Sequence, residues 1–192
     1  CRSAFDRLCK MDTIDQENIY FTGSTAIEQI FNFIKNPTLA TDIIPNLKND
    51  NFCLMTFHPV TLKLENIGAL MDYTIELILN RDTDIVITYP NNDDGTDDIQ
   101  KIIRKWENHR KIHVIKSLGS KSYYSLICST GFVIGNSSSG VIEVPYFNKI
   151  SLNVGSRQDG REKDHNVVDV KPTKMSVKKS LLDIFNGKIK SK

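Results

Sequence analysis

The sequence FVIGNSSSGVIE at residues 132–143 predicts a buried strand, a tight polar turn and the start of a helix. Backbone N–H groups at a helix N-terminus lack partners within the helix and lie at the positive end of its dipole, so this turn can bind a phosphate. The three serines add hydroxyl donors, and the two glycines allow a close approach. A structural alternative is a capping box, in which Glu143 reaches back to Ser139 or Gly140. The stretch alone leaves both interpretations open.

Apolar strands alternate with amphipathic helices on either side of this stretch. Further strands are expected at residues 52–57, 84–89, 112–116, 150–154 and 167–170, and further helices at 64–79, 96–106, 120–128 and 177–185. The run from Ile85 to Ile87 is apolar at every position, as in parallel strands that are covered by helices on both faces. The predicted fold is therefore α/β, a Rossmann-like doubly wound parallel sheet.

The first 51 residues carry a different pattern. They predict a helix at 3–10, a strand at 16–23, a helix at 25–33 with Ser24 as its N-cap, and a Pro-containing connector at 35–51. We interpret residues 1–51 as an N-terminal segment and connector from a domain crossover, 52–187 as one domain, and 188–192 as a basic tail. Because the sequence opens at Cys1 rather than at methionine, we expect a piece of a longer protein.

The composition narrows the functional class. Lys and Arg number 25 against 23 Asp and Glu, and this balance does not call for a nucleic-acid or membrane partner. The four cysteines form no C-x-x-C pair, which indicates free thiols in a reducing, cytoplasmic compartment. No apolar stretch is long enough to span a bilayer, and none resembles a signal peptide. No group of His, Cys and carboxylates has metal-ligand spacing, so no metal is expected.

Polar loops follow five of the predicted strands. They lie at residues 58–61, 90–95, 117–120, 135–140 and 155–162. Each loop alone fits ordinary turn chemistry. In a parallel α/β sheet, however, ligands bind outside the carboxyl ends of the strands, and these loops share that edge. Their convergence predicts a binding site.

Several side chains in or beside these loops are candidate ligand contacts. His58 precedes a proline at a strand end and suits a role beside phosphate or in proton transfer, although a lone histidine is often structural. Arg157 and Arg161 lie in a Gly-flanked loop, where guanidinium groups suit phosphate or carboxylate. Tyr123 and Tyr124 lie near the start of a helix beside the third loop. We expect one in the core and the other against a base ring.

Four motifs together resemble one known family. They are HPVT at 58–61, PNNDDG at 90–95, GNSSSGVIE at 135–143 and GSRQDGRE at 155–162. In order and spacing they resemble the UDP-N-acetylglucosamine 2-epimerase family, and most closely its hydrolysing members, which supply sialic acid and related sugar pathways. The resemblance runs from Asn18 to the last helix. It implies the C-terminal half of a GT-B architecture, in which two Rossmann-like domains face one cleft.

The resemblance implies a role for each matching residue. Ser137 and Ser138 resemble the pair that holds the diphosphate. Glu143 resembles the carboxylate on the ribose hydroxyls, and Arg157 resembles the arginine that closes on the nucleotide and phosphate.

The remaining matches surround the base and the reacting sugar. Leu118 and Tyr123 resemble positions that contact the uracil. His58 resembles the family histidine near the diphosphate and the reacting sugar, and it is the candidate catalytic residue. Asn91 matches a motif position by type and is one of the expected UDP or substrate contacts, without a more specific role. Some relatives carry histidine where this chain has Ser117, so any contact made there is absent.

The family's chemistry implies what this chain does and needs. A base removes the C2 proton while UDP leaves C1, and water then adds to the glycal to give N-acetylmannosamine. No cofactor is expected. The acid and base belong to an N-terminal domain without a counterpart here, and a homo-oligomeric enzyme is expected. The alternatives are a UDP-sugar glycosyltransferase of the GT-B fold and a non-catalytic nucleotide-binding module.

Overall fold

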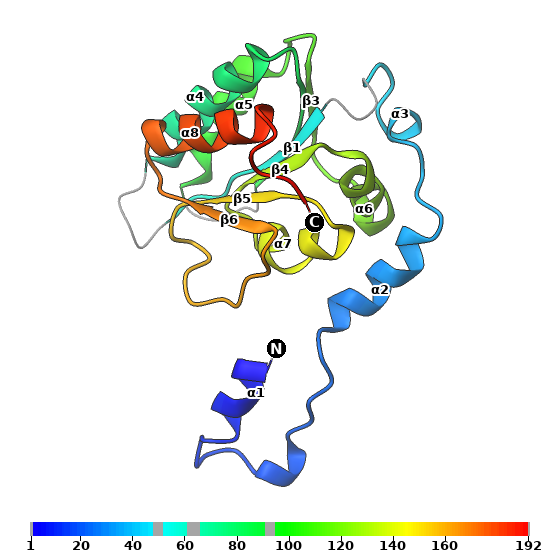
Figure 1. Cartoon of the computed structure of the whole chain (residues 1–192), viewed down its shortest axis with the longest axis vertical. Helices are drawn as coiled ribbons and strands as arrows, with labels where there is room; N and C mark the ends of the chain where they lie inside the picture. Colours follow the sequence, from blue (N-terminus) through cyan, green and yellow to red (C-terminus); the bar gives the residue numbers. More distant parts are fainter. Residues whose placement is uncertain (1, 48–51, 61–65, 91–94, 192) are drawn as a thin grey trace.

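A six-stranded parallel sheet forms the centre of the molecule (Figure 1). The computed structural model describes residues 2–47, 52–60, 66–90 and 95–191. The strands are β1 (Phe52–Thr56), β2 (Asp84–Thr88), β3 (Ile112–Ile115), β4 (Phe132–Gly135), β5 (Ser151–Val154) and β6 (Val167–Val170). They lie in the order β3-β2-β1-β4-β5-β6, and every neighbouring pair is parallel. This confirms the predicted doubly wound α/β fold.

Helices cover both faces of the sheet (Figure 1). One face is covered by α4 (Ile67–Leu79), α5 (Thr96–Trp106) and α8 (Lys174–Phe185). The other face is covered by α2 (Thr25–Ile34), α3 (Ala40–Ile43), α6 (Gly119–Ser129) and the 3₁₀ turn η2 (Val144–Phe147), which follows α7 (Ser138–Ile142). All five residues of β1 are therefore buried, as its apolar sequence predicts.

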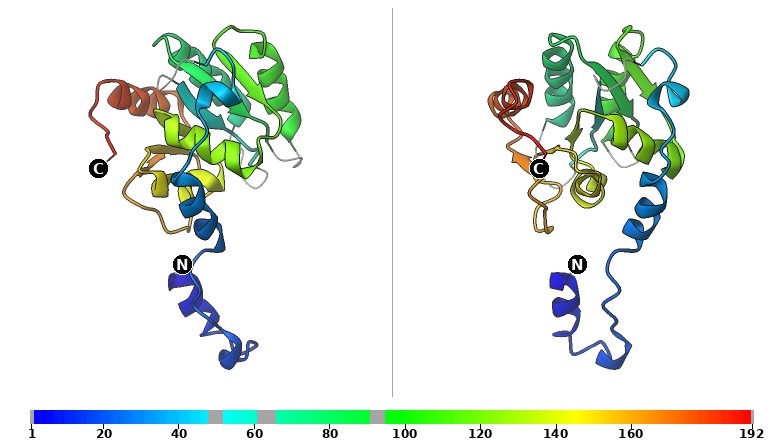
Figure 2. Two further views of the ribbon diagram at one scale, coloured as in Figure 1. Left: turned by 90° about the vertical axis from the view of Figure 1, so that its right-hand side faces the viewer. Right: turned by 45° about the vertical axis from the view of Figure 1, so that its right-hand side comes forward.

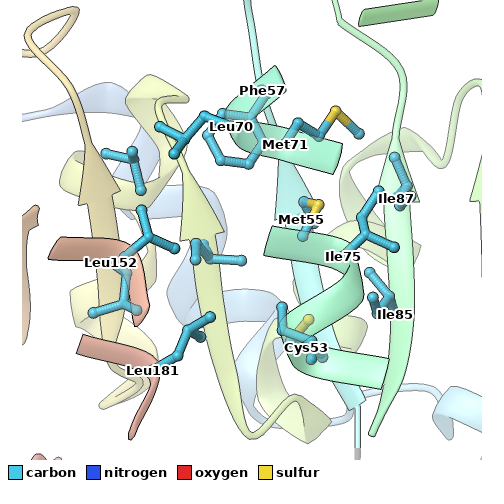
Figure 3. Packing of buried hydrophobic residues seen from close by; sticks show 14 of the residues in the cluster. Cys53, Met55, Phe57, Leu70, Met71, Ile75, Ile85, Ile87, Leu152 and Leu181 are labelled. Atoms are coloured by element: carbon cyan, nitrogen blue, oxygen red, sulfur yellow. The ribbon is translucent and has the colours of Figure 1, made fainter. Parts of the chain in front are cut away.

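Successive side chains of β1 contribute to different halves of the core. Cys53 and Met55 point toward α4 and pack with Met71 and Ile75 (Figure 3). Phe52 and Leu54 belong to the opposite cluster, under α2 and α6. This alternation is the period of a β-strand, and it joins the two helical layers through one sheet.

Side-chain caps set two helix starts that differ from those expected. The helix α4 begins at Ile67 because the Asn66 side chain accepts a hydrogen bond from the Ala69 N–H at 3.0 Å. The last helix begins at Lys174, earlier than expected, because Thr173 caps it in the same way. Within the described residues, no helix is both long enough and apolar enough to cross a bilayer.

The first part of the N-terminal segment, before α2, projects away from the sheet domain (Figure 2). Its first helix, α1 (Arg2–Leu8), has no buried residue, whereas α2 packs on α6. The strand expected at 16–23 is wrong, because Gln16–Asn18 is a 3₁₀ turn (η1) and residues 19–24 form no sheet. A strand needs a neighbour for its backbone N–H and C=O groups, and in the described structure Tyr20 stays 76% exposed. The connector also contains the single turn of α3.

Candidate functional site

The strand order places the topological switch point of the sheet between β1 and β4. The sheet runs through β2 and β3 on one side of this pair and through β5 and β6 on the other, so the chain reverses direction of winding here. Ligands of doubly wound sheets bind at such a switch point, outside the carboxyl ends of the strands. His58 lies in the loop that follows β1, and Ser137 lies in the turn that follows β4.

Gly135 brings these two strand ends into close contact. It pairs with Thr56 in the parallel register and has φ +150°. A Cβ atom at this position would lie 1.8 Å from the Thr56 carbonyl oxygen, which no side chain can tolerate. The glycine therefore allows the serine turn to lie directly against β1.

The next residue, Asn136, joins the two loops. Its side chain is fully buried, its Oδ1 accepts a hydrogen bond from the His58 N–H at 2.7 Å, and its Nδ2 donates to the His58 carbonyl oxygen at 2.8 Å. Its own N–H donates to the Thr56 carbonyl oxygen at 3.1 Å. Sequence reasoning quoted this residue within a motif but gave it no role. The available signal was an amide side chain between a glycine and a serine at a strand end.

The serine turn leads into a short helix. Ser137 occupies the N-cap with extended backbone angles, and α7 contains only five residues before η2 follows. The dipole of so short a helix is small. The capping box does not form, because Glu143 accepts a hydrogen bond from the Tyr124 hydroxyl instead of returning to the helix start.

Two adjacent tyrosines of α6 support the serine turn from the side. The Tyr123 hydroxyl bonds to the Ser139 hydroxyl, and the Tyr124 hydroxyl donates to Glu143 Oε1, both at 2.8 Å. Tyr124 is buried against Phe33 and Tyr123 is half-buried, and both line one cavity. Tyr124 is thus the tyrosine in the core, and the contact of Tyr123 with a base ring stays a prediction. Burial raises the pKa of each tyrosine to about 12, and the Glu143 carboxylate adds to the effect.

An open cavity of about 390 Å³ lies at this edge of the sheet. Five residues expected from the sequence line it: His58, Leu118, Tyr123, Ser137 and Glu143. Ser138 lies next to them as the first residue of α7. Asn91 lies outside the described residues. The volume is in the range of small-molecule sites, and the lining mixes ring surface with hydroxyl, imidazole and carboxylate groups.

The loop after β5 reaches the same strand end. Arg157 Nη1 donates to the Asn136 carbonyl oxygen at 3.3 Å, and the buried Gln158 Nε2 donates to the same oxygen at 2.9 Å. Arg157 therefore lies beside the serine turn, whereas Arg161 is exposed and lines a separate groove. The described residues hold no group of three or more His, Cys, Asp or Glu side chains placed to bind a metal ion.

Comparison with known proteins assigns the chain to a family. The sequence model of the family described as UDP-N-acetylglucosamine 2-epimerase matches residues 2–191. The chain belongs to the UDP-N-acetylglucosamine 2-epimerase family. The expected family is thereby confirmed, and the cavity at the switch point is the candidate site of an epimerase-family chain.

Two curated relatives of this family member are bacterial. The UDP-N,N'-diacetylbacillosamine 2-epimerase (hydrolyzing) of Legionella pneumophila is 29% identical over 89% of this chain and 46% of its own length. The GDP/UDP-N,N'-diacetylbacillosamine 2-epimerase (hydrolyzing) of Campylobacter jejuni is 31% identical over 79% of this chain and 40% of its own length. The chain thus spans less than half the length of these two relatives.

The fold also matches solved epimerase structures. The UDP-GlcNAc 2-epimerase of Neisseria meningitidis, solved bound to UDP-GlcNAc, aligns with 96% of this chain at a TM-score of 0.66 and 15% sequence identity. The match covers 50% of that chain. This agrees with the expectation that the Rossmann-like sheet of this epimerase-family chain is one half of a GT-B architecture.

Proposed function

We propose that this chain is the UDP-binding C-terminal half of a hydrolysing UDP-N-acetylglucosamine 2-epimerase. The observation that carries the proposal is the convergence of His58, Leu118, Ser137 and Glu143, from three different loops and the end of α7, on one cavity in a member of this family. Two curated relatives are named as hydrolysing 2-epimerases, which supports the hydrolysing outcome. Their names also support a nucleotide-linked 2-acetamido sugar as the substrate class.

The proposed nucleotide position follows the lining of the cavity and two residues beside it, Ser138 and Arg157. The hydroxyls of Ser137 and Ser138, with the guanidinium of Arg157, contact the diphosphate. Glu143 accepts hydrogen bonds from the ribose hydroxyls, and the Tyr124 hydroxyl orients that carboxylate.

The other end of the cavity receives the base. Leu118 and Tyr123 pack on the uracil, and the apolar ring face of Tyr123 suits such a contact. His58 lies near the diphosphate and the reacting sugar. Asn91, a further proposed contact of the UDP-sugar, lies outside the described residues.

The proposed reaction needs charge stabilisation from this half. A base removes the C2 proton as the C1–O bond to UDP breaks. Water then adds across the resulting double bond, which gives N-acetylmannosamine and UDP. The leaving diphosphate gains negative charge, so hydroxyl and guanidinium donors already in place stabilise the transition state more than the ground state. The acid and base lie in an N-terminal domain, and this chain alone therefore binds UDP without turnover.

The cellular setting follows from the same proposal. The product would feed synthesis of sialic acid or a related sugar, and we expect a cytoplasmic homo-oligomer that is completed by the N-terminal domain. The described cysteines, which form no disulfide, are consistent with a reducing compartment.

A calorimetric comparison of UDP with 2′-deoxy-UDP tests the ribose contact. The chain should prefer UDP by about tenfold, the value of one hydrogen bond to a charged group, and Glu143→Ala should abolish the preference. Because Tyr124 loses its partner in that variant with either ligand, the deoxy nucleotide is the internal control. Absence of UDP binding would overturn the proposal, and an unchanged preference in Glu143→Ala would overturn the role of this residue.

A further inference from the structure

We propose that Asn136 is a positioning residue, which holds the His58 loop and the Arg157 loop in fixed relation around the diphosphate. The inference rests on the proposed function, because the diphosphate is part of that proposal. Asn136 itself touches no expected ligand atom and acts through the residues that it holds. Asn136 is fully buried and does not line the cavity. Its bonds nevertheless reach both loops and the start of the serine turn.

The Asn136 side chain acts as a substitute for a neighbouring strand. The paired register of β1 and β4 ends at Thr56 and Gly135, and one further backbone bond joins the Asn136 N–H to the Thr56 carbonyl oxygen. The carboxamide continues this pairing, since it accepts from the His58 N–H and donates to the His58 carbonyl oxygen at once. Both polar groups of the His58 backbone are thereby fixed, and the imidazole leaves the backbone in one direction.

The Asn136 main chain connects the second loop. Its carbonyl oxygen accepts from Arg157 Nη1 at 3.3 Å and from Gln158 Nε2 at 2.9 Å. The Gln158 amide is 2% exposed, so its bond is shielded from competing water. A shift of the Asn136 peptide would therefore move Arg157 and Gln158 together with His58.

Asparagine is the side chain that this position needs. An acceptor and a donor must face the N–H and the carbonyl oxygen of the same residue, His58, and an uncharged amide provides both without a buried charge. Aspartate has the same shape but would place an oxygen against the His58 carbonyl oxygen, which repels it. Alanine would leave the buried His58 N–H and carbonyl oxygen without these partners. The pattern of bonds, rather than bulk, specifies the residue.

The test compares Asn136→Ala with a matched control, Asn166→Ala. Asn166 is similarly buried, and its Nδ2 bonds to Asn148, but it precedes β6 at the opposite edge of the sheet. Three quantities are measured in each protein: hydrogen exchange of the His58 amide by NMR, and affinity for UDP and for uridine by titration. Asn136→Asp, an isosteric variant, keeps the measurement possible if the alanine variant does not fold.

In Asn136→Ala we expect the His58 amide to exchange at least about tenfold faster, because its acceptor is gone. UDP affinity should fall about tenfold to a hundredfold, while uridine affinity changes less than about threefold, because only the diphosphate contacts lose their alignment. Asn136→Asp should lower UDP affinity selectively in the same way. Asn166→Ala should leave all three quantities at the values of the unsubstituted chain.

Equal losses for UDP and uridine, or a His58 amide that stays protected in Asn136→Ala, would overturn the positioning role. If the unsubstituted chain fails to bind UDP, the proposed function falls. The exchange rate of the His58 amide still decides whether Asn136 holds that loop, because it is measured without ligand.

Discussion

At the scale of single residues, the site depends on how closely two strand ends approach. The Thr56 carbonyl oxygen occupies the space that a side chain at position 135 would need. The serine turn and the His58 loop can therefore share the buried amide of Asn136, which no apolar packing could replace. The candidate site is set by backbone contact first and by ligand-facing side chains second.

Substitution of Gly135 tests this close approach. Gly135→Ala should lower the free energy of unfolding by about 3 kcal/mol or more, because its Cβ would overlap a backbone atom that cannot move independently. Urea denaturation measures the loss. Gly160→Ala is the control, since Gly160 has φ +80° but no other atom within 4 Å of the place that a Cβ would take, so only backbone strain of about 1 kcal/mol is expected. Equal losses in the two variants would contradict the steric account.

The two arginines of the loop after β5 offer a second residue-scale test. Arg157→Ala should weaken UDP binding by about 1–3 kcal/mol, the scale of a charge-assisted hydrogen bond to phosphate. Arg161→Ala removes the same charge four residues away, from an exposed position that lines a separate groove, and should leave affinity nearly unchanged. Calorimetric titration compares them. If both variants bind UDP equally, the assignment of Arg157 fails.

At the scale of elements, the contact of α6 with the end of α7 was not predictable from the sequence. The pattern indicated that one of Tyr123 and Tyr124 would be core, but it could not show that Tyr124 bonds to Glu143. These two residues are 19 positions apart in the sequence and meet only through the packing of two helices. The sequence pattern indicated a start but no end for α7, which η2 and its proline follow at once.

The Tyr124–Glu143 contact predicts an alkaline loss of stability. Burial raises the pKa of Tyr124 from 10 to about 12, with Glu143 adding to the effect, so the folded state holds the neutral phenol more tightly than the unfolded state does. This stabilisation is complete below pH 10 and is lost as the pH rises toward about 12.

Thermal melts across that interval should show a smaller pH-dependent loss in Tyr124→Phe than in the unsubstituted chain. Tyr146→Phe, at an exposed tyrosine, provides the control and should follow the unsubstituted chain. A Tyr124→Phe variant with the full alkaline loss would show that this tyrosine does not carry it.

At the scale of the whole molecule, the alternation of apolar strands and amphipathic helices predicted the sheet, and the polar loops after the strands predicted where the candidate site lies. The buried strands are visible as apolar runs such as Ile85 to Ile87. The rule that ligands bind at the carboxyl edge of a parallel sheet then gave the expected position of the candidate site. The segment at 16–23 was misread, because strand propensity at Tyr20 and Phe21 says nothing about whether a pairing strand exists. Asn136 and Gln158 were missed because their value lies in contacts between loops.

The most direct test of the central claim follows UDP-N-acetylglucosamine by proton NMR in D₂O in the presence of this chain. The account predicts that the uridine resonances broaden or shift while the sugar stays intact, since the proposed function assigns UDP binding to this half and the acid and base to an N-terminal domain. Uridine signals that are unaffected at all concentrations would contradict UDP binding. Release of UDP with deuterated N-acetylmannosamine would contradict the claim that this half needs an N-terminal domain for turnover.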